Sequence, residues 1–232
     1  MRALILAAGR GERMRPLSDR TPKPLLAAGG KMLIEYQIGR LARAGVCEIV
    51  LNIAHLPEQF TAALGDGARF GVRISFSREG ERAEDALETL GGIVKALPLL
   101  GDAPFVVVSG DIVTDFDYRS LALPAQQLAA GARDAHLVLV DNPSFHPRGD
   151  MGLADGLITR ALPWLTYANI ALLAPRLFTG EAVARKRLFP WLYQAVAGSR
   201  VSGERFRGRW HNVGTEDDLR ELDRELRARP LA

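Results

Sequence analysis

A loop of small residues and two basic side chains follow the first apolar run of the sequence. Leu6-Ala7-Ala8-Gly9 continues through Gly11 to Arg13, and Lys23 stands between two prolines. Small residues let backbone N–H groups come close to an anion, and a guanidinium and an ammonium supply the charge that phosphate oxygens need. The loop matches neither common phosphate fingerprint, because no Gly-Lys-[Ser/Thr] ends it and position 14 is Met instead of glycine. It still predicts a polyphosphate site at the end of a strand.

A carboxylate closes another apolar run, Phe105-Val106-Val107-Val108, which continues into Ser109-Gly110-Asp111. A charged group at the carboxyl edge of a strand suits a ligand or metal site in an open α/β sheet. The alternative is an N-cap for a helix near Thr114. We expect that removing this charge relieves repulsion in the metal-free protein.

The remaining polar candidates give weaker signals. Asn169 lies in an apolar strand pattern and needs a partner, which is either a ligand or a core group. His55, His136 and His146 lack metal-ligand spacing and are expected to be structural or surface residues. The single cysteine, Cys47, precedes an apolar stretch and is expected to be buried.

Alternating strand and helix patterns position these residues. Short apolar runs alternate with helical periodicity through about residue 111, which is typical of a parallel sheet in an α/β protein. Strands are predicted at 3–8, 47–53, 72–76, 105–108, 136–140 and 167–173, and helices at 33–42, 57–64, 91–99, 187–197 and 216–226.

Composition narrows the function classes. Of 232 residues, 47% are hydrophobic and 25% are charged, which argues against a disordered chain. The net charge of +3 and the aromatic content of 7% argue against a nucleic-acid-binding module. The sequence has no apolar run of about 20 residues, so we expect no membrane span and no membrane binding. We expect a cytoplasmic location.

The stretch 6–24 resembles the signature of the sugar-1-phosphate nucleotidyltransferases, L-A-A-G-x-G-x-R-[ML] followed by [ST]-x-P-K. Three further stretches resemble family motifs: 87–92 its base-recognition turn, 109–111 its metal-binding strand end, and 210–215 its second metal site. The resemblance implies an α/β, Rossmann-like three-layer nucleotidyltransferase fold with a mostly parallel mixed central sheet. It also implies one domain over 1–232 without a C-terminal β-helix, with a nucleotide-binding half to about 115 and a sugar-binding half from about 116.

The resemblance assigns roles to residues of this chain. Arg13 and Lys23 are expected to be catalytic, and Asp111 and Asn212 to hold Mg²⁺. His211 then faces away from the ion, because adjacent residues of a strand point to opposite faces. Thr89 has a second interpretation, as the cap of the helix from Gly91. The residues expected to bind nucleotide are Leu6, Ala7, Ala8, Gly9, Gly11, Arg13, Lys23, Leu87, Glu88, Thr89 and Gly110, and those expected to bind sugar are Gly149, Asp150 and Asn169.

Within the family, the chain is most similar to short bacterial members that transfer a uridylyl group from UTP to N-acetylmuramic acid α-1-phosphate in peptidoglycan recycling. The expected partners are therefore a nucleoside triphosphate and a sugar 1-phosphate, with the protein a monomer or homodimer. Two other activities stay open: a mannose-1-phosphate guanylyltransferase, and a glucose-1-phosphate thymidylyl- or uridylyltransferase. A catalytically silent nucleotide-sugar sensor is the alternative outside the enzymes.

The sequence departs from the family pattern in one stretch and at one position. Arg82 to Asp85 lengthen the loop before the base-recognition turn, which makes this loop a candidate lid. Asn212 stands where many members of the family have Asp.

Overall fold

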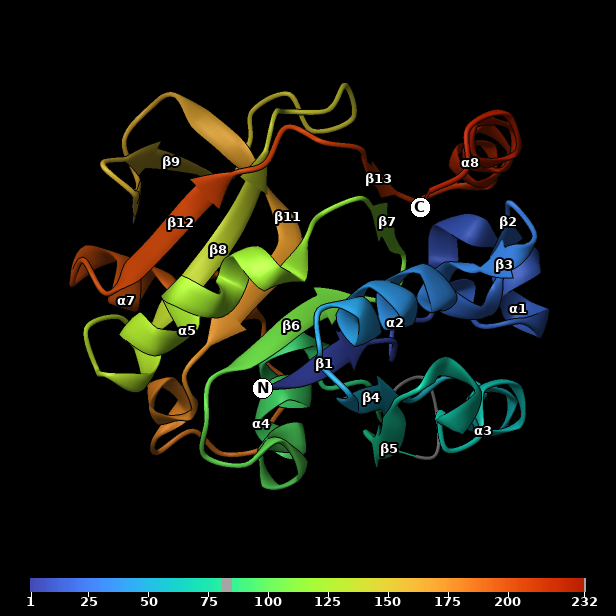
Figure 1. The fold of residues 1–232 in the computed structure, drawn as a ribbon, viewed down its shortest axis with the longest axis horizontal. Helices are drawn as coiled ribbons and strands as arrows, with labels where there is room; N and C mark the ends of the chain where they lie inside the picture. Colours follow the sequence, from blue (N-terminus) through green and yellow to red (C-terminus); the bar gives the residue numbers. More distant parts are fainter. Residues whose placement is uncertain (81–84, 232) are drawn as a thin grey trace.

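In the part of the chain that the structure describes, a nine-stranded mixed sheet forms the centre (Figure 1). The computed structural model describes residues 1–80 and 85–231. The strand order in this part of the chain is β5-β4-β1-β6-β11-β8-β12-β10-β9, and only β10 and β11 run against the other seven. The expected mostly parallel mixed sheet is confirmed. The strands are β1 (Arg2–Leu6), β4 (Glu48–Ile53), β5 (Arg73–Arg78), β6 (Phe105–Ser109), β8 (Ala135–Val140), β9 (Met151–Ala154), β10 (Leu157–Thr159), β11 (Trp164–Leu173) and β12 (Val201–Arg205).

Helices cover both faces of the sheet, which gives the expected three layers (Figure 1). The core on one face is built with α2 (Leu33–Arg43), α3 (Pro57–Leu64) and α5 (Ala122–Ala129). The core on the other is built with α4 (Glu88–Leu100), α6 (Leu188–Trp191) and α7 (Tyr193–Ala197). Ala3, Leu4 and Ile5 of β1 are fully buried, as a run without polar alternation predicts for a strand with two covered faces.

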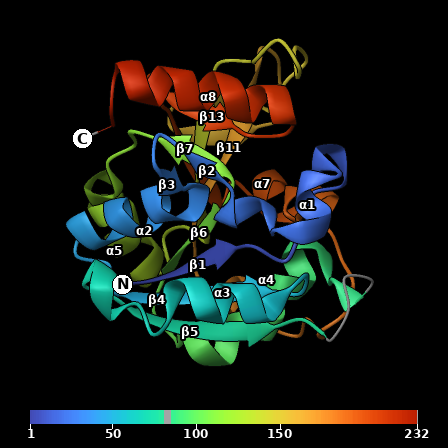
Figure 2. The same cartoon turned by 90° about the vertical axis from the view of Figure 1, so that its right-hand side faces the viewer.

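A smaller cluster lies beside the main sheet and involves the C-terminal helix. Helix α8 (Glu216–Ala228) lies over the pairs β2 (Ala27–Ala28) with β3 (Lys31–Met32) and β7 (Ile112–Thr114) with β13 (Trp210–Asn212) (Figure 2). Its buried Leu222 and Leu226 pack with Val113 and Val213. Residues from both ends of the sequence therefore meet in one core.

Two local predictions were wrong. Cys47 is exposed, while its neighbour Val46 is buried. The helix predicted at 187–197 is two short helices, α6 and α7; Phe189 is extended, at φ −102° and ψ 138°, because it precedes a proline. The segment between β1 and β2 contains short helical turns, at Glu12–Met14, Leu17–Arg20 (α1) and Lys23–Leu25.

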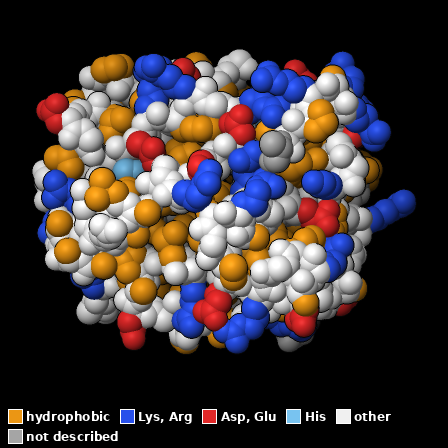
Figure 3. Space-filling view, viewed as in Figure 1, with side chains coloured by type: hydrophobic (Ala, Val, Ile, Leu, Met, Phe, Trp, Pro, Cys, Tyr) orange, Lys and Arg blue, Asp and Glu red, His pale blue; other side chains and the backbone are white. Residues whose placement is uncertain are grey.

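Basic and acidic side chains are interspersed over the face shown in Figure 3. Among the described residues, no helix has the length and apolar character needed to cross a membrane.

Candidate functional site

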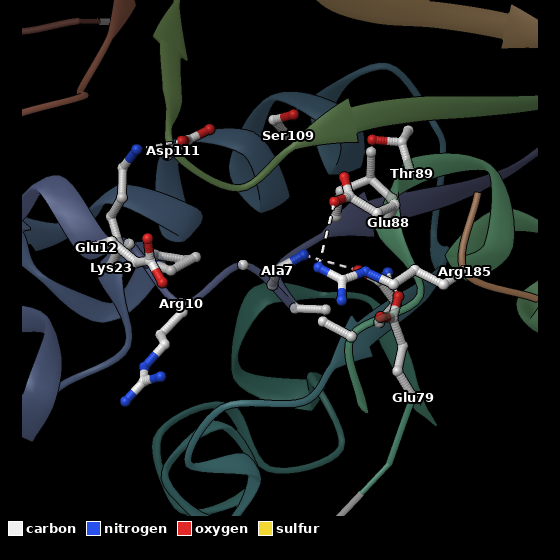
Figure 4. A pocket seen from close by; sticks show the side chains of 17 residues that line it. Ala7, Arg10, Glu12, Lys23, Glu79, Glu88, Thr89, Ser109, Asp111 and Arg185 are labelled. Carbon is white, nitrogen blue, oxygen red and sulfur yellow. Dashed lines mark hydrogen bonds and ion pairs between the residues drawn. The ribbon is translucent and has the colours of Figure 1, made fainter. Parts of the chain in front are cut away.

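A cavity of about 580 Å³ opens at the C-terminal ends of the parallel strands (Figure 4). Because β1, β4, β5 and β6 run in the same direction, the segments that follow them meet at one edge of the sheet. Figure 4 shows Lys23 and Asp111 at one end of the cavity and Glu88, Thr89 and Arg185 at the other. Its lining in the described chain is Leu6, Ala7, Ala8, Gly9, Arg10, Gly11, Glu12, Lys23, Pro24, Asn52, Glu79, Ala86, Glu88, Thr89, Ser109, Asp111 and Arg185.

The predicted anion loop forms one wall of this cavity. Gly11 has a left-handed backbone at φ 66°, and a Cβ there would lie 3.3 Å from the Cβ of Lys23, so glycine suits both the turn and the packing. Ser18 Oγ donates to the carbonyl of Gly11 at 2.8 Å, and His55 Nε2 lies 2.7 Å from the carbonyl oxygen of Ser18. His55 therefore braces the loop, in keeping with a structural role.

Lys23 and Asp111 form an ion pair inside the cavity. Lys23 Nζ lies 2.5 Å from Asp111 Oδ2, and their side chains are only 11% and 24% exposed. We expected that removing the Asp111 charge would relieve repulsion in the metal-free protein. That expectation was wrong, because the carboxylate is paired with the Lys23 ammonium. The helix-cap alternative was also wrong, since Thr114 belongs to strand β7. Gly110, just before Asp111, donates its N–H to the carbonyl of Leu6 at 2.9 Å and ties the ends of β6 and β1 together.

The segment 210–215, predicted to be the second metal site, lies next to Asp111. Strand β13 pairs with β7 so that Asn212 is opposite Ile112, and the N–H of Val213 donates to the carbonyl of Asp111 at 3.2 Å. His211 Nε2 lies 3.3 Å from Glu225 of α8. A carboxylate that holds an ammonium at 2.5 Å, beside an amide residue, offers the hard oxygen donors that Mg²⁺ prefers. The described residues contain no cluster of three or more His, Cys, Asp or Glu placed to hold a metal.

Arg13 lies outside the described lining of the cavity. Its side chain is exposed and rests against Gly214, where a Cβ would lie 3.2 Å from a guanidinium nitrogen. The first and the last family-like motifs therefore touch each other. Arg10 and Arg185 do line the cavity, and neither was predicted from the sequence.

The predicted base-recognition turn lies at the start of helix α4. Glu88 is the first helical residue and has a left-handed φ of 60°. Leu87 occupies the N-cap position, and no side-chain hydrogen bond caps the helix there. Thr89 lies inside the first turn and lines the cavity, so its interpretation as a helix cap was wrong. Backbone hydrogen bonds join Leu87, Leu90 and Gly91 to Lys186, which brings Arg185 to the turn, 3.7 Å from Glu88.

Two buried polar residues lie between the anion loop and the base-recognition turn, and the sequence patterns did not indicate them. Asn52 lies near the end of β4 and Glu79 follows β5; they are 2% and 6% exposed. Burial raises the pKa of Glu79 above its ordinary value, against hydrogen bonds from Leu87 N and from Asn52 that lower it. An Asn near the end of a strand at this edge is the signal that could have identified Asn52.

The three predicted sugar residues lie in the second half of the chain, outside the described lining of the cavity. Asp150 accepts from Tyr167 N at 2.8 Å and lies 3.0 Å from His146 Nε2. Gly149 has φ 69°, and a Cβ there would lie 2.7 Å from Asn142 Oδ1. Asn169 has φ 56° at an irregularity in the pairing of β11 with β8, and its side chain forms no hydrogen bond to another described residue. It is therefore not a satisfied core amide within the described part of the chain.

His136 and His146, both in the second half of the chain, have structural partners. His136 bonds to Ser202 Oγ at 2.9 Å, and His146 bonds to Asp150. Of the candidate lid at Arg82 to Asp85, residues 82–84 lie outside the described part of the chain, and Asp85 is exposed.

Comparisons with known proteins agree with this architecture. A family model described as nucleotidyl transferase matches residues 2–146. The chain is 46% identical over 226 residues to an N-acetylmuramate alpha-1-phosphate uridylyltransferase of Neisseria meningitidis serogroup B, covering 95% of this chain and 96% of that protein. It is 32% identical over 222 residues to a protein of the same name from Caulobacter vibrioides, covering 91% of each. A crystal structure from Bacillus anthracis, described as that of a putative glucose-1-phosphate thymidylyltransferase with sucrose, shares the fold, with a TM-score of 0.83 at 19% identity and coverage of 100% and 97%.

Proposed function

This chain belongs to the nucleotidyl transferase family, and we propose that it transfers the uridylyl group of UTP to N-acetylmuramic acid α-1-phosphate. The products are UDP-N-acetylmuramate and pyrophosphate. Identity of 46% over 95% of the chain to a uridylyltransferase of that name supports the choice of substrates. The structural observation that carries the chemistry is the Lys23–Asp111 pair facing a loop of small residues in one cavity.

The reaction requires charge and alignment more than proton transfer. A phosphate oxygen of the sugar 1-phosphate attacks the α-phosphorus of UTP, a new P–O bond forms, and the bond to the pyrophosphate oxygen breaks with its electron pair. The attacking phosphate is already largely a dianion near pH 7, so no general base is needed. The protein must hold both substrates in line and stabilise the charge that develops.

The first half of the chain supplies that charge stabilisation. Backbone groups at Gly9 and Gly11 line the cavity and are proposed to bind the triphosphate. Arg13 is proposed to contact the phosphates as well, although its guanidinium lies against Gly214, outside the described lining of the cavity. Lys23 is proposed to contact the α-phosphate and the attacking phosphate, because its ammonium already lies in the cavity.

The base and the sugar are assigned to the two other parts of the site. The turn at Leu87, Glu88 and Thr89 is proposed to bind uracil through its backbone and the threonine hydroxyl. Gly149, Asp150 and Asn169 are proposed to contact the sugar. Among these three, Asn169 has a side-chain amide that no hydrogen bond to another described residue occupies.

Magnesium is the proposed cofactor. Asp111 and Asn212 would hold it at the junction of β7 and β13, with substrate phosphates and water as the other ligands. When bound, the ion would neutralise phosphate charge and help to orient the triphosphate. We further propose a cytoplasmic enzyme of peptidoglycan recycling.

A substrate panel tests this function. Purified protein is assayed for pyrophosphate release with UTP, dTTP and GTP against the 1-phosphates of N-acetylmuramic acid, glucose and mannose, with and without EDTA. The expected result is highest kcat/KM for UTP with N-acetylmuramic acid α-1-phosphate, lost in EDTA. A preference for another pair would replace the substrates, and binding without turnover of any pair would indicate a silent sensor.

A further inference from the structure

An unbroken series of hydrogen bonds joins the anion loop to the base-recognition turn. Ala7 N donates to Asn52 Oδ1 at 2.7 Å, and Asn52 Nδ2 donates to Glu79 Oε1 at 2.5 Å. Glu79 Oε2 in turn accepts from Leu87 N at 2.6 Å. Asn52 and Glu79 each use both polar atoms of the side chain in this series. The series therefore connects Ala7 to Leu87, which lie far apart in the sequence.

This connection is buried and tightly enclosed. Asn52 and Glu79 are 2% and 6% exposed, yet both reach the wall of the cavity. A Cβ at Gly92 of α4 would lie 2.3 Å from Glu79 Oε1 and 2.6 Å from Asn52 Nδ2. Lys95 Nζ also donates to the carbonyl of Glu79 at 3.1 Å, which anchors the residue from the same helix. The space admits these two side chains in few other arrangements.

We propose that Asn52 and Glu79 are positioning residues, which fix the separation and orientation of the phosphate-binding loop and the base-binding turn for one nucleotide. The inference rests on the proposed function insofar as that nucleotide is UTP. The two segments follow different strands, and Asn52 and Glu79 are the hydrogen-bonded link observed between Ala7 and Leu87. A nucleoside triphosphate must contact both segments at once, so an error in their spacing weakens its binding.

The direction of each hydrogen bond makes the proposal testable. In Glu79→Gln, the side-chain oxygen still accepts from Leu87, but the new NH₂ faces the NH₂ of Asn52. In Asn52→Asp, two carboxylates face each other, which is tolerated only when they share a proton. In the double variant, the carboxylate introduced at position 52 accepts from Ala7 N and from the NH₂ introduced at position 79. The amide oxygen at position 79 still accepts from Leu87 N, so the double variant restores every bond with the central one reversed.

The experiment measures the Kd of UTP by calorimetry with Mg²⁺, and the KM of each substrate, for wild type, both single variants and the double variant. Glu58→Gln, on the exposed surface of α3, is the matched control. We expect each single variant to weaken UTP binding on the order of tenfold to a hundredfold, the loss of one hydrogen bond to a charged group. We expect little change in the KM of the sugar phosphate and recovery in the double variant to within about threefold of wild type.

A pH series adds a second readout. UTP binding by Asn52→Asp should improve relative to wild type as the pH falls, since a shared proton restores the central hydrogen bond. Wild-type UTP affinity in both single variants would overturn the proposal. So would a folded double variant that binds UTP no better than Glu79→Gln, because the Glu79 carboxylate would then act on the nucleotide directly. Failure of the wild type to bind UTP would count against the proposed function alone, and the same variants would be measured with the triphosphate that does bind.

Discussion

The two halves of the chain contribute unequally to the cavity. Sixteen of the seventeen described lining residues lie between positions 6 and 111, and Arg185 alone comes from the second half. In the first half, parallel strands end at the same edge, so residues just after each strand converge on one site. In the second half, β11 and β10 run against the other strands, and Gly149, Asp150 and Asn169 lie beside loops and a pairing irregularity instead. Parallel topology makes a site easier to anticipate from sequence.

Loss of the ammonium in the first half should give the largest effect. Lys23→Met should lower kcat by about 10²- to 10³-fold, the scale for one donor that stabilises developing charge. The unfolding free energy should fall by only about 1–3 kcal/mol, because Asp111 loses its partner while the methionine retains the apolar part of the lysine side chain. Steady-state kinetics and thermal unfolding of the same samples test this. A wild-type kcat with a collapsed melting temperature would make Lys23 a structural residue.

Asp111→Asn should separate the two roles of the ion pair. Without the carboxylate, the largely buried Lys23 ammonium loses its partner, so the metal-free protein should lose about 1–3 kcal/mol of unfolding free energy. Mg²⁺-dependent turnover should also be lost. Urea unfolding in EDTA and a Mg²⁺ titration of activity measure the two effects. Unchanged activity at low Mg²⁺ would place the metal elsewhere.

Asn169→Gly tests the second half without adding backbone strain. Glycine accepts the left-handed φ of 56°, so stability should be unchanged or higher. Loss of the amide should raise the KM of the sugar phosphate about tenfold, equivalent to one hydrogen bond, and leave the KM of UTP unchanged. Kinetics with each substrate varied in turn provide the measurement. An equal rise in both KM values would remove the distinction between the two halves.

The smallest effect is expected at the junction between the halves. Asn212→Leu removes an amide oxygen at similar size and should raise the Mg²⁺ concentration for half-maximal activity several-fold, about 1 kcal/mol. Asn212→Asp should do the opposite and tighten Mn²⁺ binding to the free protein, detectable by electron paramagnetic resonance. A wild-type Mg²⁺ titration in Asn212→Leu would mean that the amide only braces the turn at Val213.

Sequence patterns predicted most helices and strands because apolar residues recur at the positions that each element buries. Helix α3 was predicted with its observed bounds. Both ends of strands β1, β4, β6 and β8 were predicted to within two residues. The kinked α6–α7 segment was missed because Pro190 overrides an amphipathic pattern locally. Periodicity did not reveal the pair β7–β13 either, because three-residue strands about a hundred positions apart leave little local pattern.

The sequence by itself determined the small-residue loop, the lysine between prolines and the carboxylate after a buried strand, because each is a local property of a few neighbouring residues. Only the tertiary structure decided that Lys23 pairs with Asp111, that Arg13 rests on Gly214, and that Asn52 and Glu79 join two walls of the cavity. Those contacts depend on strand order and register, which set distances between residues far apart in the chain and which no local pattern of residue types encodes.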